Sequence, residues 1–168
     1  MIITQIRFEN YRAYYGEVIF DFPIDGERNV SIIFANNDVG KTCFFSGVLF
    51  CLYGSKDSDS LKDLINVNAQ REGTYQSSVT IFADQDGEEI SITRDISLRG
   101  NIKEDISSKD FRSRLVITKG GVPISATDDA EKMDYINSIV HEDAAQYFFF
   151  DGEKINDYSV ADGPEYRE

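Results

Sequence analysis

The feature that most constrains the fold is the stretch 41–53, which is apolar on nearly every side of the helix that it would form. Its apolar members are Cys43, Phe44, Phe45, Val48, Leu49, Phe50, Cys51 and Leu52. Such a helix is stable only when other layers of the protein enclose it, because no face of it suits water. Gly47 allows a neighbouring element to approach closely, and Gly54 is expected to end the helix. The chain is therefore predicted to fold around one buried helix.

Runs of alternating apolar and polar residues, separated by turn residues, predict antiparallel hairpins around this helix. The expected pairs are 2–8 with 17–22, 78–83 with 89–96, and 112–118 with 122–124. Two denser apolar runs, 29–34 and 144–150, are predicted to be buried strands. Another helix is expected after Thr127 or Asp128, either of which can cap it. Together these elements predict an α/β fold with a mixed sheet and antiparallel hairpins.

Composition excludes several functions. The chain has 168 residues, enough for one domain, with 17 basic and 30 acidic side chains and a net charge of −13. This balance argues against a broad nucleic-acid-binding surface, so any DNA contact is expected in parts of the protein outside this chain. No apolar run is long enough to span a membrane, and no signal peptide is expected. Cys43 and Cys51 are too far apart on one helix for a disulfide, which favours a cytoplasmic location.

The strongest indication of function is Gly40-Lys41-Thr42, which opens the predicted helix after an apolar run and a polar loop. Backbone N–H groups and the positive end of a helix favour a phosphate at such a place. Lys41 would reach the β- and γ-phosphates, and the Thr42 hydroxyl would bind Mg²⁺. The usual P-loop pattern begins with glycine, where this chain has Ala35. The sequence therefore predicts a P-loop NTPase that binds ATP and Mg²⁺.

Three segments resemble the N-terminal half of SMC/SbcC/RecF-type ABC ATPases: 6–12 (Ile-Arg-Phe-Glu-Asn-Tyr-Arg), the loop before Lys41, and 49–54 (Leu-Phe-Cys-Leu-Tyr-Gly). The loop of that family reads Gly-x-Asn-Gly-x-Gly-Lys-Ser/Thr, and this chain departs from it at Ala35 and Asp38. The resemblance implies an ABC-ATPase-like N-terminal lobe with Arg12 near the nucleotide, although a surface role for Arg12 is equally open. The expected nucleotide-binding residues are Arg12, Asn36, Asn37, Asp38, Val39, Gly40, Lys41, Thr42 and Cys43.

A fourth segment, 147–155 (Tyr-Phe-Phe-Phe-Asp-Gly-Glu-Lys-Ile), resembles the DndD family, the SMC-like ATPases of bacterial DNA phosphorothioation systems. It implies that Asp151 stands where the wider family has its Q-loop glutamine. Asp151 would then bind Mg²⁺ together with Thr42 and serve catalysis together with Lys41. The alternative is that Asp151 is only a turn residue before Gly152.

Two elements that ABC-type hydrolysis requires are missing from the sequence: a Walker B strand ending in Asp-Glu and a Leu-Ser-Gly-Gly signature. The resemblance implies that both lie in a C-terminal half beyond a coiled coil. Residues 1–158 would form the N-terminal lobe of the head, and 159–168 a polar tail toward that coiled coil. ATP would be held between two heads of a homodimer that drives DNA-modification or nuclease partners. The chain alone is not expected to hydrolyse ATP.

Two other functions remain open. In one, Ala35 and Asp38 make the P-loop degenerate, and the chain is a non-catalytic dimerisation or docking module. In the other, it is the head of a nuclease-linked defence ATPase. Arg94 is interpreted as a solvated residue rather than a contact to nucleotide or DNA. His141, the only histidine, is interpreted as a helix-end residue rather than a metal ligand.

Overall fold

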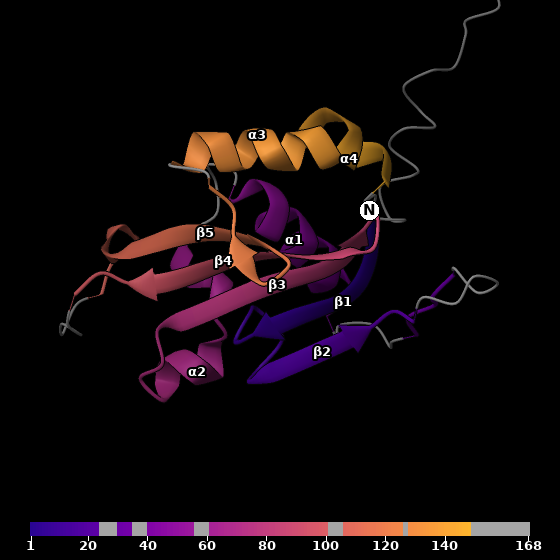
Figure 1. Ribbon diagram of the computed structural model, residues 1–168. Helices are drawn as coiled ribbons and strands as arrows, with labels where there is room; N and C mark the ends of the chain where they lie inside the picture. Colours follow the sequence, from indigo (N-terminus) through magenta and orange to yellow (C-terminus); the bar gives the residue numbers. More distant parts are fainter. Residues whose placement is uncertain (24–29, 35–39, 56–60, 101–105, 126–127, 149–168) are drawn as a thin grey trace, which may run out of the picture.

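The computed structural model describes residues 1–23, 30–34, 40–55, 61–100, 106–125 and 128–148 (Figure 1). The strands are β1 (Ile2–Glu9), β2 (Glu17–Asp21), β3 (Gln76–Gln85), β4 (Glu88–Leu98), β5 (Phe111–Lys119) and β6 (Val122–Pro123). The α-helices are α1 (Lys41–Tyr53), α2 (Val67–Arg71), α3 (Asp129–Ile139) and α4 (Glu142–Phe148). Two 3-10 turns are η1 (Leu61–Leu64) and η2 (Ser108–Asp110).

The strands form one six-stranded sheet in the order β2-β1-β3-β4-β5-β6. Every pairing between these strands is antiparallel. The prediction of a mixed sheet is therefore wrong for the described residues. The three expected hairpins are confirmed, because each joins neighbouring strands directly. The register aligns one apolar row across the sheet, which runs through Phe20, Ile6, Ile81, Ile92 and Ile117.

The β3–β4 hairpin closes on two residues, Asp86 and Gly87, which both have positive φ values, 56° and 84°. A turn of this kind matches the twist of the two strands, and Asp-Gly is one of its preferred sequences. The side chain of Asp84 accepts a hydrogen bond from the Gly87 N–H at 3.0 Å, which helps to hold the turn. The turn therefore lies where the sequence predicted it, between the expected strands 78–83 and 89–96.

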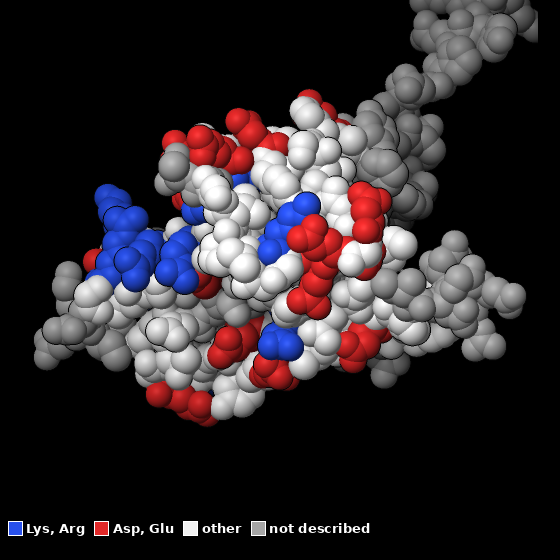
Figure 2. Space-filling model, viewed as in Figure 1, with Lys and Arg blue, Asp and Glu red and all other residues white. Residues whose placement is uncertain are grey.

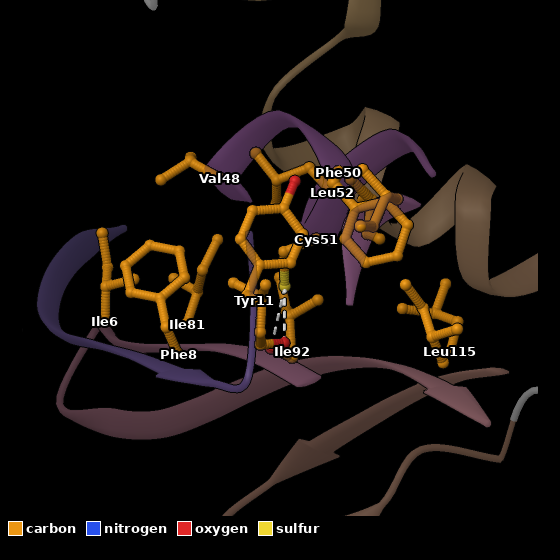
Figure 3. Packing of buried hydrophobic residues seen from close by; sticks show 14 of the residues in the cluster. Ile6, Phe8, Tyr11, Val48, Phe50, Cys51, Leu52, Ile81, Ile92 and Leu115 are labelled. Atoms are coloured by element: carbon orange, nitrogen blue, oxygen red, sulfur yellow. Dashed lines mark hydrogen bonds between the residues drawn. The ribbon is translucent and has the colours of Figure 1, made fainter. Parts of the chain in front are cut away.

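Helix α1 packs on one face of the sheet, and α3 lies on the same side of the sheet, beyond α1 in the view of Figure 1. The buried side chains of α1 meet those of β1, β3 and β4 in the main core (Figure 3). The Cys51 thiol is fully buried and donates toward the carbonyls of Val79, at 3.3 Å, and Ile92, at 3.2 Å. The prediction of a buried helix holds for Phe44, Val48, Phe50, Cys51 and Leu52, whereas Phe45 is 40% exposed, so the helix is not enclosed on every side. Its predicted end at Gly54 is confirmed, because the Gly54 N–H donates to the Phe50 carbonyl.

The predicted buried strand at 29–34 is wrong for the residues that the structure describes, 30–34. These residues belong to no strand, and their apolar side chains face solvent: Val30 is 79% exposed, Ile32 70% and Phe34 88%. A buried central strand needs hydrogen-bonding neighbours on both sides. Within the described part of the chain, the strands satisfy one another in the antiparallel sheet, and none lies beside this segment.

The predicted strand at 144–150 is also wrong, because residues up to Phe148 lie in helix α4 and the remaining two fall outside the described residues. The His141 carbonyl accepts hydrogen bonds from the N–H groups of Ala144 and Ala145, both at 3.0 Å. Alanine favours a helix, and Glu142 suits the positive end of the helix. These residues open a helix before the aromatic run begins, which the apolar run alone did not reveal.

Candidate phosphate-binding site

The start of α1 has the backbone geometry of an anion site. Gly40 is the N-cap of the helix and has a left-handed φ of 102°. No side-chain hydrogen bond caps the helix here, and its first turn holds no acidic residue. The Gly40 carbonyl accepts the first helical hydrogen bond, from the Phe44 N–H at 3.0 Å. The first N–H groups of a helix have no acceptor within the helix, and the dipole makes this end positive. The arrangement suits a phosphate group.

Side chains at this end face outward as a nucleotide site requires. Lys41 and Thr42 are exposed, whereas Cys43 is half-buried. An ammonium group and a hydroxyl on the first two residues of the helix can reach a phosphate and its Mg²⁺ ion. These residues therefore fit ATP and Mg²⁺. The other predicted loop residues (Asn36, Asn37, Asp38, Val39) and Asp151 lie outside the described residues, so their roles stay predictions.

The loop between β1 and β2 packs directly against Gly40. Tyr14 Oη donates a hydrogen bond to the Gly40 carbonyl at 2.9 Å. A Cβ atom at Gly40 would lie 3.3 Å from both Ala13 Cβ and Tyr14 Cε1. Glycine is thus required at position 40 both by its backbone conformation and by the lack of space. Burial, together with the nearby Cys43 thiol, raises the pKa of Tyr14 to about 12, so its hydroxyl stays a donor at neutral pH.

Sequence reasoning did not find Tyr14. In the sequence it is one of two adjacent tyrosines in an expected turn, and nothing in that pattern separates Tyr14, which holds Gly40, from Tyr15, which bonds Glu72 at the surface. Only the folded arrangement brings residues 14 and 40 together.

Arg12 is fixed by its backbone in the same loop. It has a positive φ of 46°, its N–H donates to the Leu64 carbonyl at 2.8 Å, and its carbonyl accepts from Asn66 Nδ2 at 2.6 Å. Asn66 also caps α2 by accepting from the Asn68 N–H at 2.9 Å. The same loop reaches the start of α1 through Tyr14, whereas the Arg12 backbone is held by Leu64 and Asn66. Contact between Arg12 and a nucleotide stays a prediction.

Arg94 is not solvated, and that interpretation was wrong. It is only 9% exposed and donates to the last carbonyls of α1, from Nε to Cys51 O and from Nη2 to Leu52 O, both at 3.1 Å. Burial lowers its pKa, while Cys51 and Asp129 act in the opposite direction. The signal was present in the sequence: Arg94 occupies the inward position of β4, in step with Ile90, Ile92 and Ile96.

Charge elsewhere is distributed unevenly. Figure 2 shows acidic side chains along α3 and basic side chains gathered at one end of the viewed face. The exposed Arg112 and Arg114 of β5 interact with β4, through Ser97 and Asp95 respectively, both at 3.3 Å. On this face the basic side chains form one group, and acidic side chains are spread over much of the rest.

Neither a cluster of metal-ligating side chains nor a membrane-spanning helix is found in the part of the chain that the structure describes. The described residues contain no group of three or more His, Cys, Asp and Glu side chains that could hold a metal ion. His141 Nδ1 accepts from the Asp143 N–H at 3.3 Å at the start of α4, so its interpretation as a helix-end residue is confirmed. None of the helices in the described ranges is long and apolar enough to cross a bilayer.

A sequence profile described as an AAA domain matches residues 5–162, nearly the whole chain. The chain belongs to this family. Membership confirms the coarse resemblance, an ATP-binding domain of the SMC/RecF-like ATPase class, for which ATP and Mg²⁺ are the usual ligands. A comparison with curated proteins gives no match.

Proposed function

We propose that this chain is the N-terminal, ATP-binding half of a DndD-like SMC-type ATPase head. The observation that carries the proposal is the start of α1 in an AAA domain: a left-handed Gly40 held by Tyr14, followed by the exposed Lys41 and Thr42. Backbone N–H groups would bind the β-phosphate, Lys41 would neutralise the terminal phosphates, and Thr42 would bind Mg²⁺. Asp151 is proposed as a second Mg²⁺ ligand.

Hydrolysis would require parts that this chain does not contain. A Walker B carboxylate and a signature helix would come from a C-terminal half and a second head, so that ATP lies between two heads. Mg²⁺, when bound, would withdraw charge from the terminal phosphates. Lys41 and the α1 N–H groups position the phosphates but do not orient a water molecule, so this chain alone should bind ATP without turning it over. The cycle would drive DNA modification or defence through partner proteins, in the cytoplasm.

The test is MgATP binding to the chain combined with its C-terminal half, in wild type and Lys41→Ala. The substitution should lower ATP affinity about 100-fold, because it removes a charge-assisted contact worth about 2.7 kcal/mol. Lys109→Ala is the matched control, since Lys109 is an exposed lysine at η2 and should leave affinity unchanged.

A second candidate, a docking module without ATPase activity, is favoured by the exposed apolar side chains at 30–34. The same measurement separates the two. If neither wild type nor Lys41→Ala binds MgATP, the docking module is the better explanation. A nuclease-linked defence ATPase would bind ATP in the same way and differ only in its partners.

A further inference from the structure

Arg94 joins three elements that lie far apart in the sequence. It projects inward from β4, bonds the carbonyls of Cys51 and Leu52 at the end of α1, and its Nη2 lies 3.6 Å from Met133 Sδ on α3. Its guanidinium also lies over the Phe50 ring, 6.0 Å from the ring centre. Arg94 is therefore the point at which the sheet, the end of α1 and α3 meet.

A second bond ties the same turn of α1 to α3. Tyr53, the last residue of α1, donates from Oη to the carbonyl of Val140, the residue that ends α3, at 2.9 Å. Burial, with the charge of Glu142, raises the pKa of Tyr53 to about 12, so this hydroxyl stays a donor. The end of α1 is thus linked to α3 twice, directly at Val140 and through Arg94 at Met133.

The opposite end of α1 is the candidate phosphate site. The helix has 13 residues and a length of about 20 Å, and a packed helix of this length moves as one body. A phosphate that pulls on Gly40 and Lys41 would therefore shift Cys51 and Leu52 as well. Arg94 bonds the carbonyls of those two residues, so such a shift would reach Met133 and α3.

We propose that Arg94 is a positioning residue that transmits the state of the nucleotide site along α1 to α3. The inference rests on the proposed ATP-binding function and adds a route by which occupancy is sensed outside the site.

The chemistry explains why arginine occupies this position. The final carbonyls of a helix lack partners within the helix and form its negative end, which a cation stabilises. A planar guanidinium can donate to two carbonyls and still reach Met133, whereas the single ammonium of lysine cannot serve all three in a fixed geometry. Arg94→Lys keeps the charge but is expected to break the three-way connection.

The test compares wild type and Arg94→Lys in the complete head, this chain together with its C-terminal half. Three quantities are measured: the Kd for MgATP, kcat, and the change in amide hydrogen exchange of residues 129–140 on adding ATP. Wild type should show ATP-dependent protection of α3. Arg94→Lys should keep Kd within about threefold, lose that protection, and lower kcat about tenfold. Arg114→Gln, which removes an exposed arginine of the neighbouring strand, is the control and should behave as wild type.

Tyr53→Phe provides an independent variant if Arg94→Lys folds poorly. It removes only the hydroxyl that bonds Val140 and should reduce the ATP-dependent protection of α3 while Kd is unchanged. The proposal is overturned if wild type binds ATP with no change in α3, or if both variants retain the full change. If wild type does not bind ATP at all, the proposed function has failed and this inference fails with it.

Discussion

Gly47 in the middle of α1 illustrates how one missing side chain sets the distance between two layers. A Cβ atom at this position would lie 2.4 Å from Cε1 of Phe8 and 3.1 Å from Cε1 of Tyr11. Both aromatic side chains are fully buried, so neither ring has space to move. Glycine normally weakens a helix, and here that cost is offset by the close packing of α1 on β1.

Gly47→Ala is therefore expected to destabilise the protein by up to about 2 kcal/mol, although alanine is the better helix former. The overpacking penalty, about 1–3 kcal/mol, exceeds the gain in helix propensity of about 1 kcal/mol. Urea unfolding measures the difference. Ser46→Ala, one residue earlier in the same helix, is the control and should change stability by less than about 0.5 kcal/mol. A Gly47→Ala protein more stable than wild type would show that the layers are not in tight contact.

At the scale of single residues, the sequence predicted the glycines that local backbone geometry or helix packing requires. It missed the residues whose role depends on a contact with a distant part of the chain. Gly40, Gly47 and Gly54 were recognised because each stands at a turn, a cap or an apolar helix. Tyr14 and Arg94 were not, because their partners lie 26 and at least 39 residues away. Arg94 had a weak signal in its inward position on β4, which the preference of arginine for water outweighed.

At the scale of elements, α3 begins with a side-chain cap at Asp128, one of the two residues that the sequence offered for it. Asp128 accepts a hydrogen bond from the Glu131 N–H at 2.9 Å. Asp128→Ala should cost about 1 kcal/mol and speed the amide exchange of α3, because it removes the side-chain acceptor of the Glu131 N–H in the first turn. Asp128→Asn keeps an acceptor and should retain most of the stability. Urea unfolding of the two variants side by side checks this, and equal losses would mean that charge matters more than the cap.

Hairpins were predictable because their signals are local: alternation on both arms and a turn sequence between them. The segments 29–34 and 144–150 were not, since a short apolar run by itself does not say whether it becomes a strand, a helix or an exposed segment. In 144–150 the deciding residues were the alanines before the aromatic run. In 30–34 the deciding factor is whether another strand lies alongside, which no local pattern records.

At the scale of the whole molecule, the antiparallel sheet and α1 form a closed core, while the segment 30–34 stays outside it. Three apolar side chains there, those of Val30, Ile32 and Phe34, are each at least 70% exposed. Proteins rarely leave such a cluster in water without a partner. If this chain is half of an ATPase head, the C-terminal half is the natural partner to cover it.

Phe34→Ser is predicted to leave the chain itself intact and to weaken its assembly with the C-terminal half. Phe34 is 88% exposed, so the free energy of unfolding of the chain alone should change by less than about 0.5 kcal/mol. Burying a phenylalanine at an interface contributes about 1.5–3 kcal/mol, so the Kd between the halves should rise at least about tenfold. Val122→Ser, which changes an apolar residue that is 66% exposed on the edge strand β6, is the control and should assemble normally. Normal assembly of Phe34→Ser would mean that the C-terminal half leaves this segment uncovered. A large loss of stability in the chain alone would mean that Phe34 already contributes to the core of the chain.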